Sequence, residues 1–464
     1  MVYQLAVDIG ASGGRHILGW LENGLIRTEE VFRFENQAET RNGVLCWDVN
    51  RLLQNIITGM KICKALGKIP SALGIDTWAA DFVLLDKHGQ LLGEAVSYRD
   101  ERTLGMDEVV ETIISHGELY RRAGIQKQPF NTIYQLMAIK RRQPGLLEEA
   151  DSFLMLPDYF NFCLTGVKKQ EYTNATSTAL VNARGFSWDS YVINKLGLPA
   201  GLFGPLSSPG ARVGELLPAV AEEAGFNCTV VLPCTHDTGS AYLAVPADSR
   251  GDIFLSSGTW SLIGIETEEP VINQKSREAN FTNEGGYGFR FRFLKNIMGL
   301  WIIQSIKREL HHSCSYDDLV NQAKNSTDYN VIINVNDPVF FAPPSMIDAV
   351  KKTCVKEGNR PPETTGEIVQ CVYASLAASY AEAIIQIQNI MARAYEKIRI
   401  VGGGSKDGYL NTLIAQAAGI PVFAGPVEGS AVGNLLAQMI AAGEFASLEA
   451  AREIVRKSFE IRRY

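Results

Sequence analysis

The sequence predicts an α/β fold made of two related halves with a cleft between them. Residues 5–7 form a short apolar run that leads through Asp8 into a glycine-rich turn, which is typical of a buried strand. The pattern of strand, small-residue turn and second strand recurs at residues 253–262, which indicates an internal duplication. Helical spacing over residues 369–397 precedes a strand at 398–401 and a third glycine turn at 402–408.

The N-terminal half shows the order of elements most clearly. Residues 15–19 and 26–34 continue the opening strand as a meander, and Asn-Gly lies in the break between them. Residues 49–65 have apolar side chains every three or four positions, which predicts a helix, and residues 72–76 return as a strand. Three hairpinned strands, a helix and a returning strand are typical of a ribonuclease-H-like unit.

Length and composition fit two large domains. The chain has 464 residues, of which 46% are hydrophobic and 20% charged. A Pro-, Asp- and Gly-containing segment at 246–252 has the composition of a linker, so we expect domains at 1–245 and 246–464. The net charge of -7, without a basic block, argues against a nucleic-acid partner.

Cysteine content and hydropathy bear on the compartment. No apolar run approaches the length of about 18 residues that a membrane helix needs, and no signal peptide precedes the first strand. The eight cysteines form no C-x-x-C pair, so we expect reduced core thiols in a cytoplasmic protein without a membrane partner. Cys354 and Cys371 flank a loop and are the one pair considered for a disulfide.

The first glycine turn, residues 10–14, has the features of a site for nucleotide phosphates. Glycine allows close backbone approach, and free N–H groups in such a turn bind anions. Asp8 ends the preceding strand, where an enzyme needs a carboxylate for magnesium. An ordinary hairpin explains this stretch equally well, but three such turns, at Gly10, Gly258 and Gly402, favour nucleotide binding. No P-loop motif occurs in the sequence.

Asp237 and Trp78 each allow two interpretations. Asp237 follows a predicted strand and precedes a predicted helix, so spacing favours an N-cap, with a general base as the alternative. His236 beside it is either a core residue or a donor to substrate. Trp78 lies between Asp76 and Asp81 and is either a core tryptophan or the wall of a sugar pocket.

Seven stretches, spread over essentially the whole chain, resemble the FGGY family of carbohydrate kinases. They are DIGASGGR from Asp8, GIDTWAADFVLLD from Gly74, FNTIYQL from Phe130, LPDYFNFCLTG from Leu156, THDTGSA from Thr235, MGLW from Met298 and VGGGSKDGYLN from Val401. This resemblance implies two ribonuclease-H-like (actin-like ATPase) domains with an interdomain active-site cleft. It also implies ATP-dependent phosphorylation of a ketose, L-rhamnulose, at its 1-hydroxyl in L-rhamnose degradation.

The same resemblance assigns roles to individual residues. Asp237 becomes the expected catalytic base, and Asp8 is expected to hold Mg²⁺ through water. The residues expected to contact ATP are Ala11, Ser12, Gly13, Gly14, Arg15, Thr259, Gln304 and Gly402. Those expected to face the sugar are Ala79, His236, Asp237, Thr238 and Asn296. Ala79 departs from the family pattern, which has glycine there, and this puts a tight sugar fit at that position in question.

Two alternatives stay open at this point. One is an FGGY kinase for another ketose, such as L-fuculose or L-xylulose, because the fold does not select the sugar. The other is an ATP-binding, sugar-sensing regulator. Such regulators usually carry a helix-turn-helix before the ATPase core, whereas four residues precede the first predicted strand here. The oligomeric state is open between monomer and homodimer.

Overall fold

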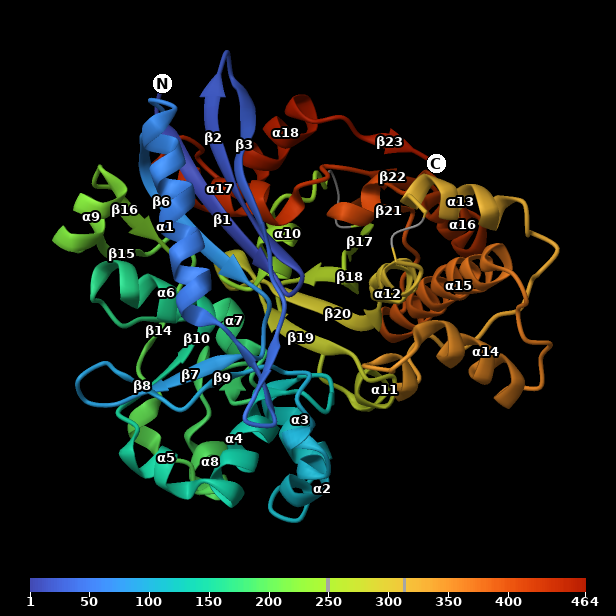
Figure 1. Ribbon diagram of the computed structural model, residues 1–464, viewed down its shortest axis with the longest axis horizontal. Coiled ribbons are helices and arrows are strands. Elements are labelled where there is room, and N and C mark those ends of the chain that lie inside the picture. The colour runs from blue at the N-terminus through green and yellow to red at the C-terminus, as the bar shows by residue number, and fades with distance from the viewer. Residues whose placement is uncertain (248–250, 312–313) are drawn as a thin grey trace. The chain divides into compact units, whose positions relative to one another are not determined.

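The chain folds into two compact units. The computed structural model describes residues 1–247, 251–311 and 314–464 (Figure 1). Residues 248–250 of the predicted linker lie outside the described residues. The first unit contains Met1–Pro246, Glu266–Phe293 and Gly429–Phe459, and the second contains Ala247–Ile265, Leu294–Glu428 and Glu460–Tyr464. These units differ from the continuous division expected at 245/246, because two later segments return to the first unit.

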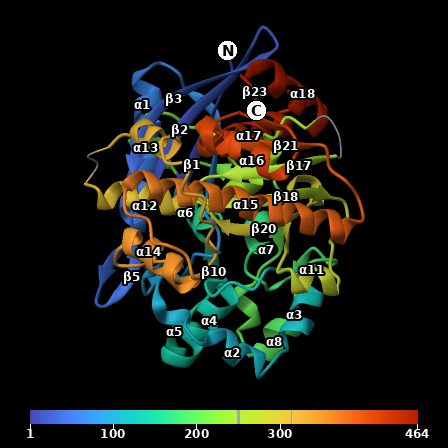
Figure 2. The same ribbon diagram turned by 90° about the vertical axis from the view of Figure 1, so that its right-hand side faces the viewer.

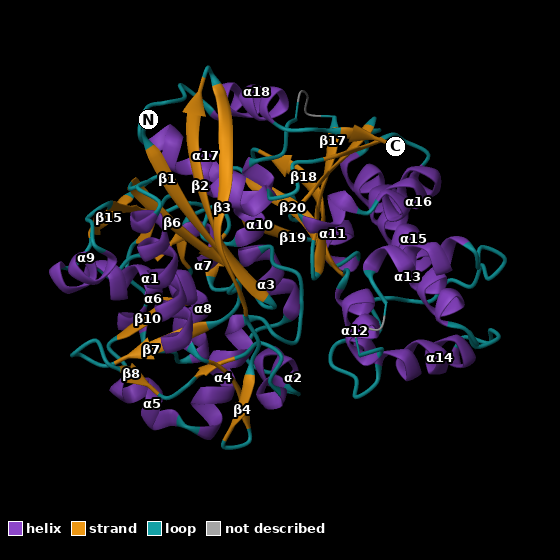
Figure 3. Cartoon of the chain, turned by 45° about the horizontal axis from the view of Figure 1, so that its top comes forward, coloured by secondary structure: helices purple, strands orange, loops and turns teal. Residues whose placement is uncertain are grey.

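The first unit is built around a six-stranded sheet in the order β15-β16-β6-β1-β2-β3 (Figure 3). Its strands are β1 (Tyr3–Gly10), β2 (Gly13–Glu22), β3 (Leu25–Glu35), β6 (Pro70–Thr77), β15 (Arg212–Glu215) and β16 (Thr229–Val231). β2 pairs antiparallel with β1 and β3, and β6 pairs parallel with β1. The predicted meander and returning strand are confirmed.

Helix α1 (Val49–Ala65) has the bounds that its apolar spacing predicts. The side chain of Asp48 accepts a hydrogen bond from the backbone N–H of Arg51, which caps the first turn. Leu52 and Ile56, four residues apart, are buried on one face of the helix.

The remaining elements of the first unit complete it around this sheet. The helices are α2 (Met106–Glu111), α3 (His116–Ala123), α4 (Thr132–Arg142), α5 (Pro144–Glu149), α6 (Leu156–Thr165), α7 (Tyr172–Thr176), α8 (Ser190–Leu196), α9 (Pro218–Ala224), α10 (Asp237–Leu243), α11 (Gln274–Glu278), α17 (Gly429–Ala441) and α18 (Leu448–Ser458). The other strands are β4 (Glu39–Arg41), β5 (Val44–Trp47), β7 (Phe82–Leu85), β8 (Leu91–Leu92), β9 (Ala95–Val96), β10 (Ser152–Met155), β11 (Gln170–Glu171), β12 (Val181–Asn182), β13 (Ser187–Trp188), β14 (Leu206–Ser207) and β19 (Thr282–Gly285).

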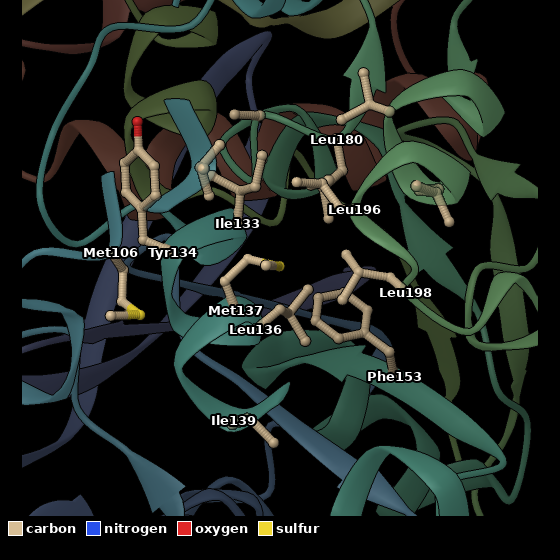
Figure 4. Packing of buried hydrophobic residues seen from close by; sticks show 14 of the residues in the cluster. Met106, Ile133, Tyr134, Leu136, Met137, Ile139, Phe153, Leu180, Leu196 and Leu198 are labelled. Carbon is tan, nitrogen blue, oxygen red and sulfur yellow. The ribbon is translucent and has the colours of Figure 1, made fainter. Parts of the chain in front are cut away.

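An apolar core surrounds helix α4 (Figure 4). Ile133, Leu136 and Met137 of α4 are buried in one cluster with Phe153 of β10 and Leu196 of α8. Full burial of each such side chain stabilises the fold by about 1.5–3 kcal/mol. This core fixes α4, whose first turns contact the loop that follows β6.

Helix α17 comes from the C-terminal part of the sequence and packs against α10, β1 and β6. Gly433 makes this close packing possible, because a Cβ atom there would lie 1.7 Å from the backbone oxygen of Ser240 in α10. The crossing of α17 and α10 therefore requires a residue without a side chain at position 433.

The second unit repeats the arrangement of an antiparallel hairpin beside a parallel strand. Its strands follow the order β18-β17-β21-β22-β23, and β17 pairs antiparallel with β18 and parallel with β21. Their bounds are β17 (Asp252–Ser257), β18 (Trp260–Thr267), β21 (Lys397–Val401), β22 (Val422–Ala424) and β23 (Arg462–Arg463), and β20 (Phe291–Met298) runs from the first unit into the second. The helices are α12 (Trp301–Glu309), α13 (Tyr316–Lys324), α14 (Met346–Lys356), α15 (Thr365–Met391) and α16 (Gly408–Ala418).

Helix α15 packs against α13 and α16 (Figure 2). By length and composition it is the one helix among the described residues that could cross a membrane, but 72% of its most apolar window is buried. Such burial is typical of the core helix of a globular domain. The absence of a membrane partner stays a prediction.

Cys354 of α14 and Cys371 of α15 lie close together, but the candidate disulfide between them is not formed. Their Sγ atoms are 3.9 Å apart and all eight cysteines are free, whereas a disulfide needs about 2.05 Å. Both side chains are buried, and burial raises the pKa of the Cys371 thiol. The pair is therefore two buried thiols in contact.

Candidate active site

Three aspartates meet at the carboxyl ends of neighbouring strands in the first unit. The parallel register of β1 and β6 pairs Asp8 with Asp76 and places Thr77 next along β6. Thr77 forms a parallel bridge with His236, so Asp237 follows directly at the same edge. Ligands of α/β sheets usually bind at this edge. Asp76 lies within the family-like stretch from Gly74, but the resemblance assigns it no role.

Burial and repulsion between neighbouring carboxylates raise the pKa values of Asp76 and Asp237. The side chain of Asp76 is fully buried, and burial together with the charges of Asp8 and Asp237 holds its pKa well above the usual value. Burial and the charge of Asp8 raise the pKa of Asp237 to about 7. Asn434 Nδ2 donates to Asp76 Oδ2 at 2.6 Å, and Arg15 Nε lies 3.3 Å from Asp8 Oδ2.

The carboxylates of Asp8 and Asp76 are suited to binding a magnesium ion. The described residues contain no group of three or more His, Cys, Asp or Glu side chains that could enclose a metal ion. Mg²⁺ in phosphoryl transfer usually binds one or two carboxylates, substrate phosphates and water. Asp8 and Asp76 offer two adjacent carboxylates, and a cation would lower the raised pKa of Asp76.

Asp237 begins helix α10 and does not cap it. The N-cap is His236, so the cap role that spacing favoured for Asp237 is not found. Asp237 Oδ1 accepts hydrogen bonds from the backbone N–H of Thr238 at 2.6 Å and from its hydroxyl at 3.2 Å. The Asp237 side chain is 28% exposed, which leaves the carboxylate accessible to a ligand.

Of the residues expected to contact phosphate, Ala11 and Ser12 form the turn between β1 and β2, and Gly13, Gly14 and Arg15 begin β2. Asn36, which the motifs did not indicate, holds this turn through Nδ2 to Gly10 O at 3.0 Å and its backbone N–H to Ser12 O. Gly14 is required by packing, since a Cβ atom there would lie 2.2 Å from the ring of Phe34. Part of the glycine pattern is therefore explained by the sheet itself.

The loop after β6 holds Ala79 at its surface and buries its neighbours. Trp78 is 6% exposed and its indole N–H donates to Asp81 Oδ2 at 2.8 Å, so Trp78 is a core tryptophan. Trp47 Nε1 donates to the same oxygen, and burial raises the pKa of Asp81 to about 6. Ala80 has a φ of 74°, and its carbonyl accepts hydrogen bonds from Thr132 and Gln135 of α4.

In the second unit, two turns occupy the carboxyl ends of β17 and β21. Leu300 N–H donates to Gly258 O and Trp301 N–H to Thr259 O, which joins the first turn to the start of α12, the helix that carries Gln304. Gly402 has a φ of 88°, and a Cβ atom there would lie 2.9 Å from the oxygen of Ser257. Thr259, Gln304 and Gly402 thus lie on neighbouring segments.

One expected sugar contact belongs to a different unit from the others. Asn296 belongs to β20 in the second unit, whereas Ala79, His236, Asp237 and Thr238 belong to the first. The roles of all these residues stay predictions.

Family models match most of this chain. The model described as the FGGY family of carbohydrate kinases, N-terminal domain, matches residues 3–244, and the C-terminal domain model matches residues 253–442. The chain belongs to the FGGY family of carbohydrate kinases. The two-domain kinase fold implied by the sequence is confirmed for this FGGY kinase, and its family implies ATP as a substrate.

Relatives of this FGGY kinase are similar over their full length. A rhamnulokinase of Halalkalibacterium halodurans is 48% identical over 100% of this chain and 99% of its own length. The rhamnulokinase of Bacillus subtilis is 41% identical over 100% of this chain and 95% of its own length.

Solved structures show the same fold at low sequence identity. Xylulose kinase from Lactobacillus acidophilus has a TM-score of 0.80 and 15% identity, covering 99% of this chain and 93% of that one. Plasmodium falciparum glycerol kinase with ADP has a TM-score of 0.76 and 15% identity, and the match covers 99% of this chain and 94% of that one.

Proposed function

We propose that this FGGY kinase transfers the γ-phosphoryl group of ATP to the 1-hydroxyl of L-rhamnulose, in cytoplasmic L-rhamnose degradation. The observation that carries this proposal is full-length identity of 38–48% to rhamnulokinases of several bacteria. This identity extends over 99–100% of this chain. The 15% identity to a xylulose kinase supports the fold alone.

In this mechanism Asp237 is the general base. The 1-hydroxyl gives its proton to the carboxylate, its oxygen bonds to the γ-phosphorus, and the bond from that phosphorus to the bridging oxygen of ADP breaks. A base whose pKa is about 7 matches neutral conditions, because it is substantially ionised yet still basic enough to accept a proton.

The other expected site residues hold the reactants. Ala11 to Arg15, Thr259, Gln304 and Gly402 are proposed to bind ATP, and Ala79, His236, Thr238 and Asn296 the ketose. Asp8, through water, and Asp76 would hold Mg²⁺. When bound, Mg²⁺ neutralises charge that develops on the phosphoryl oxygens.

A coupled assay of ADP release with MgATP and a panel of ketoses tests this function. We expect kcat/KM for L-rhamnulose to exceed that for its C-4 epimer L-fuculose and for L-xylulose by about tenfold or more, because a hydroxyl in the wrong position leaves polar groups of the pocket unpaired. Preference for another ketose would reject L-rhamnulose as the substrate but would still support the sugar-kinase activity. ATP binding without turnover of any sugar would favour the regulator.

A further inference from the structure

A buried arginine adjoins the proposed base through His236. Arg292 is 0% exposed, and each nitrogen of its guanidinium has a neighbour within the first unit. Nε donates to Gly285 O at 2.9 Å, Nη1 lies 3.1 Å from Glu284 Oε2, and Nη2 lies 3.1 Å from His236 Nδ1. Gly239 of α10 lies beside the guanidinium, and a Cβ atom there would be in ordinary van der Waals contact with Arg292 Cζ, at 3.6 Å.

This contact decides which nitrogen of His236 carries the proton. A guanidinium can only donate, so a nitrogen 3.1 Å from Nη2 must accept. Burial and the charge of Arg292 hold the pKa of His236 well below the usual value, so the ring is neutral. A neutral ring that accepts at Nδ1 carries its proton on Nε2.

The competing tautomer, with the proton on Nδ1, has a hydrogen-bond acceptor nearby. Glu284 Oε2 lies 3.3 Å from His236 Nδ1 and would accept a proton there. That tautomer would direct an N–H at the donor Nη2 of Arg292, which is repulsive. Glu284 Oε2 lies 3.1 Å from Arg292 Nη1, so this carboxylate already has a positive counter-charge beside it. The arginine therefore favours Nε2–H.

In the Nε2–H tautomer, the nitrogen that carries the proton is the one near the proposed base. His236 Nε2 lies 3.5 Å from Asp237 Oδ1, the oxygen that also accepts from the N–H and hydroxyl of Thr238. All three donors are on the side of Oδ1. The second oxygen, Oδ2, is then the one left to accept a proton from substrate.

We propose that Arg292 is a positioning residue that fixes His236 as the Nε2–H tautomer, so that Oδ1 of Asp237 faces donors and Oδ2 accepts the substrate proton. The assignment of Oδ2 rests on the proposed function, whereas the tautomer does not. Arg292 acts through His236 and does not itself touch the reacting atoms.

The tautomer is measured by ¹⁵N NMR of histidine-labelled protein, with the His236 signal assigned from the His236→Gln variant. We expect the wild type and Arg292→Lys, which keeps a donor, to show neutral Nε2–H. Arg292→Met should shift the population toward Nδ1–H. Arg452→Met is the matched control, because Arg452 is also buried, pairs with Glu266 and should leave the tautomer unchanged.

Kinetic measurements distinguish the loss of His236 positioning from a general loss of folded structure. We expect Arg292→Met to lower kcat by about 10- to 100-fold, the range known for removing a partner that orients a metal-bound histidine, with a smaller change in KM for ATP. Arg292→Lys should recover most of the lost rate.

Nδ1–H in the wild type would overturn the proposal, as would wild-type tautomer and kcat in Arg292→Met. Should Arg292→Met not fold, the spectra of the wild type and Arg292→Lys still decide the tautomer. Failure of L-rhamnulose turnover in the wild type would reject the proposed function and leave the tautomer measurement intact.

Discussion

At the scale of single residues, Asp237 is the side chain on which the proposed chemistry depends. Asp237→Asn removes the basic oxygen at nearly constant volume, so we expect kcat to fall by about 10²- to 10⁴-fold. ATP binding should change little, and thermal stability should be kept or rise, because Asp237 does not cap α10 and the substitution removes a buried charge that Asp8 repels. Steady-state kinetics, calorimetric ATP titration and thermal melts measure turnover, ATP affinity and stability. Near-normal turnover would show that Asp237 is not the general base.

The raised pKa of Asp237 predicts a pH dependence. The carboxyl group must be ionised to accept a proton, and its pKa is about 7. We therefore expect kcat/KM for the ketose to fall about tenfold per pH unit below that value and to level off above it. A profile that stays flat well below pH 7 would contradict this role for Asp237.

Sequence motifs identify site residues that lie within one continuous stretch of the chain, but not the contacts between distant stretches. Asp8, Asp76 and Asp237 all lie within quoted motifs, and the predicted hairpin carries the residues expected to bind phosphate. Asp76 acquires its importance from the register of β1 and β6, and its partner Asn434 is 358 positions away. Long-range partners of this kind do not follow from local periodicity.

At the scale of elements, the packing of α17 against α10 holds the helix that begins with Asp237. Gly433→Ala would place a Cβ atom against the backbone oxygen of Ser240, so α10 and α17 must separate. Overpacking of this type costs about 1–3 kcal/mol, and α10 carries Asp237, so kcat should fall as well. Chemical denaturation and kinetics measure the two effects.

A second helical glycine provides the control for this substitution. Gly145 of α5 has no heavy atom within 4 Å of the position its Cβ would take. Gly145→Ala should therefore leave kcat unchanged and keep or slightly raise stability. Equal behaviour of the two variants would show that the α10–α17 contact does not constrain the site.

Elements with strong periodicity were predicted well, and those set by distant packing were not. Helix α1 has its predicted bounds because its apolar spacing is regular over 17 residues. The return of α17 to the first unit was not predicted, because it depends on contacts with β1, β6 and α10. The thiols of Cys354 and Cys371 do meet, but flanking a loop does not establish the geometry of a bond.

At the scale of the whole molecule, the carboxylates at the strand ends link stability to Mg²⁺. Asp8 raises the pKa values of Asp76 and Asp237, so Asp8→Asn should relieve repulsion and raise the melting temperature of the ligand-free protein. Mg²⁺ with a nucleotide should stabilise the wild type by about 2.7 kcal/mol at 100 times Kd. Asp8→Asn should lose most of that gain, whereas an equal gain in both proteins would exclude Asp8 from the metal site.

The central claim is that this chain phosphorylates L-rhamnulose at its 1-hydroxyl, and ³¹P NMR of a reaction containing L-rhamnulose and MgATP tests it most directly. We predict that the γ-phosphate signal of ATP decreases, that ADP and one sugar phosphate form in equal amounts, and that the new phosphorus couples to the two protons on C-1. Coupling to other protons, or ADP and inorganic phosphate without a sugar phosphate, would contradict the claim.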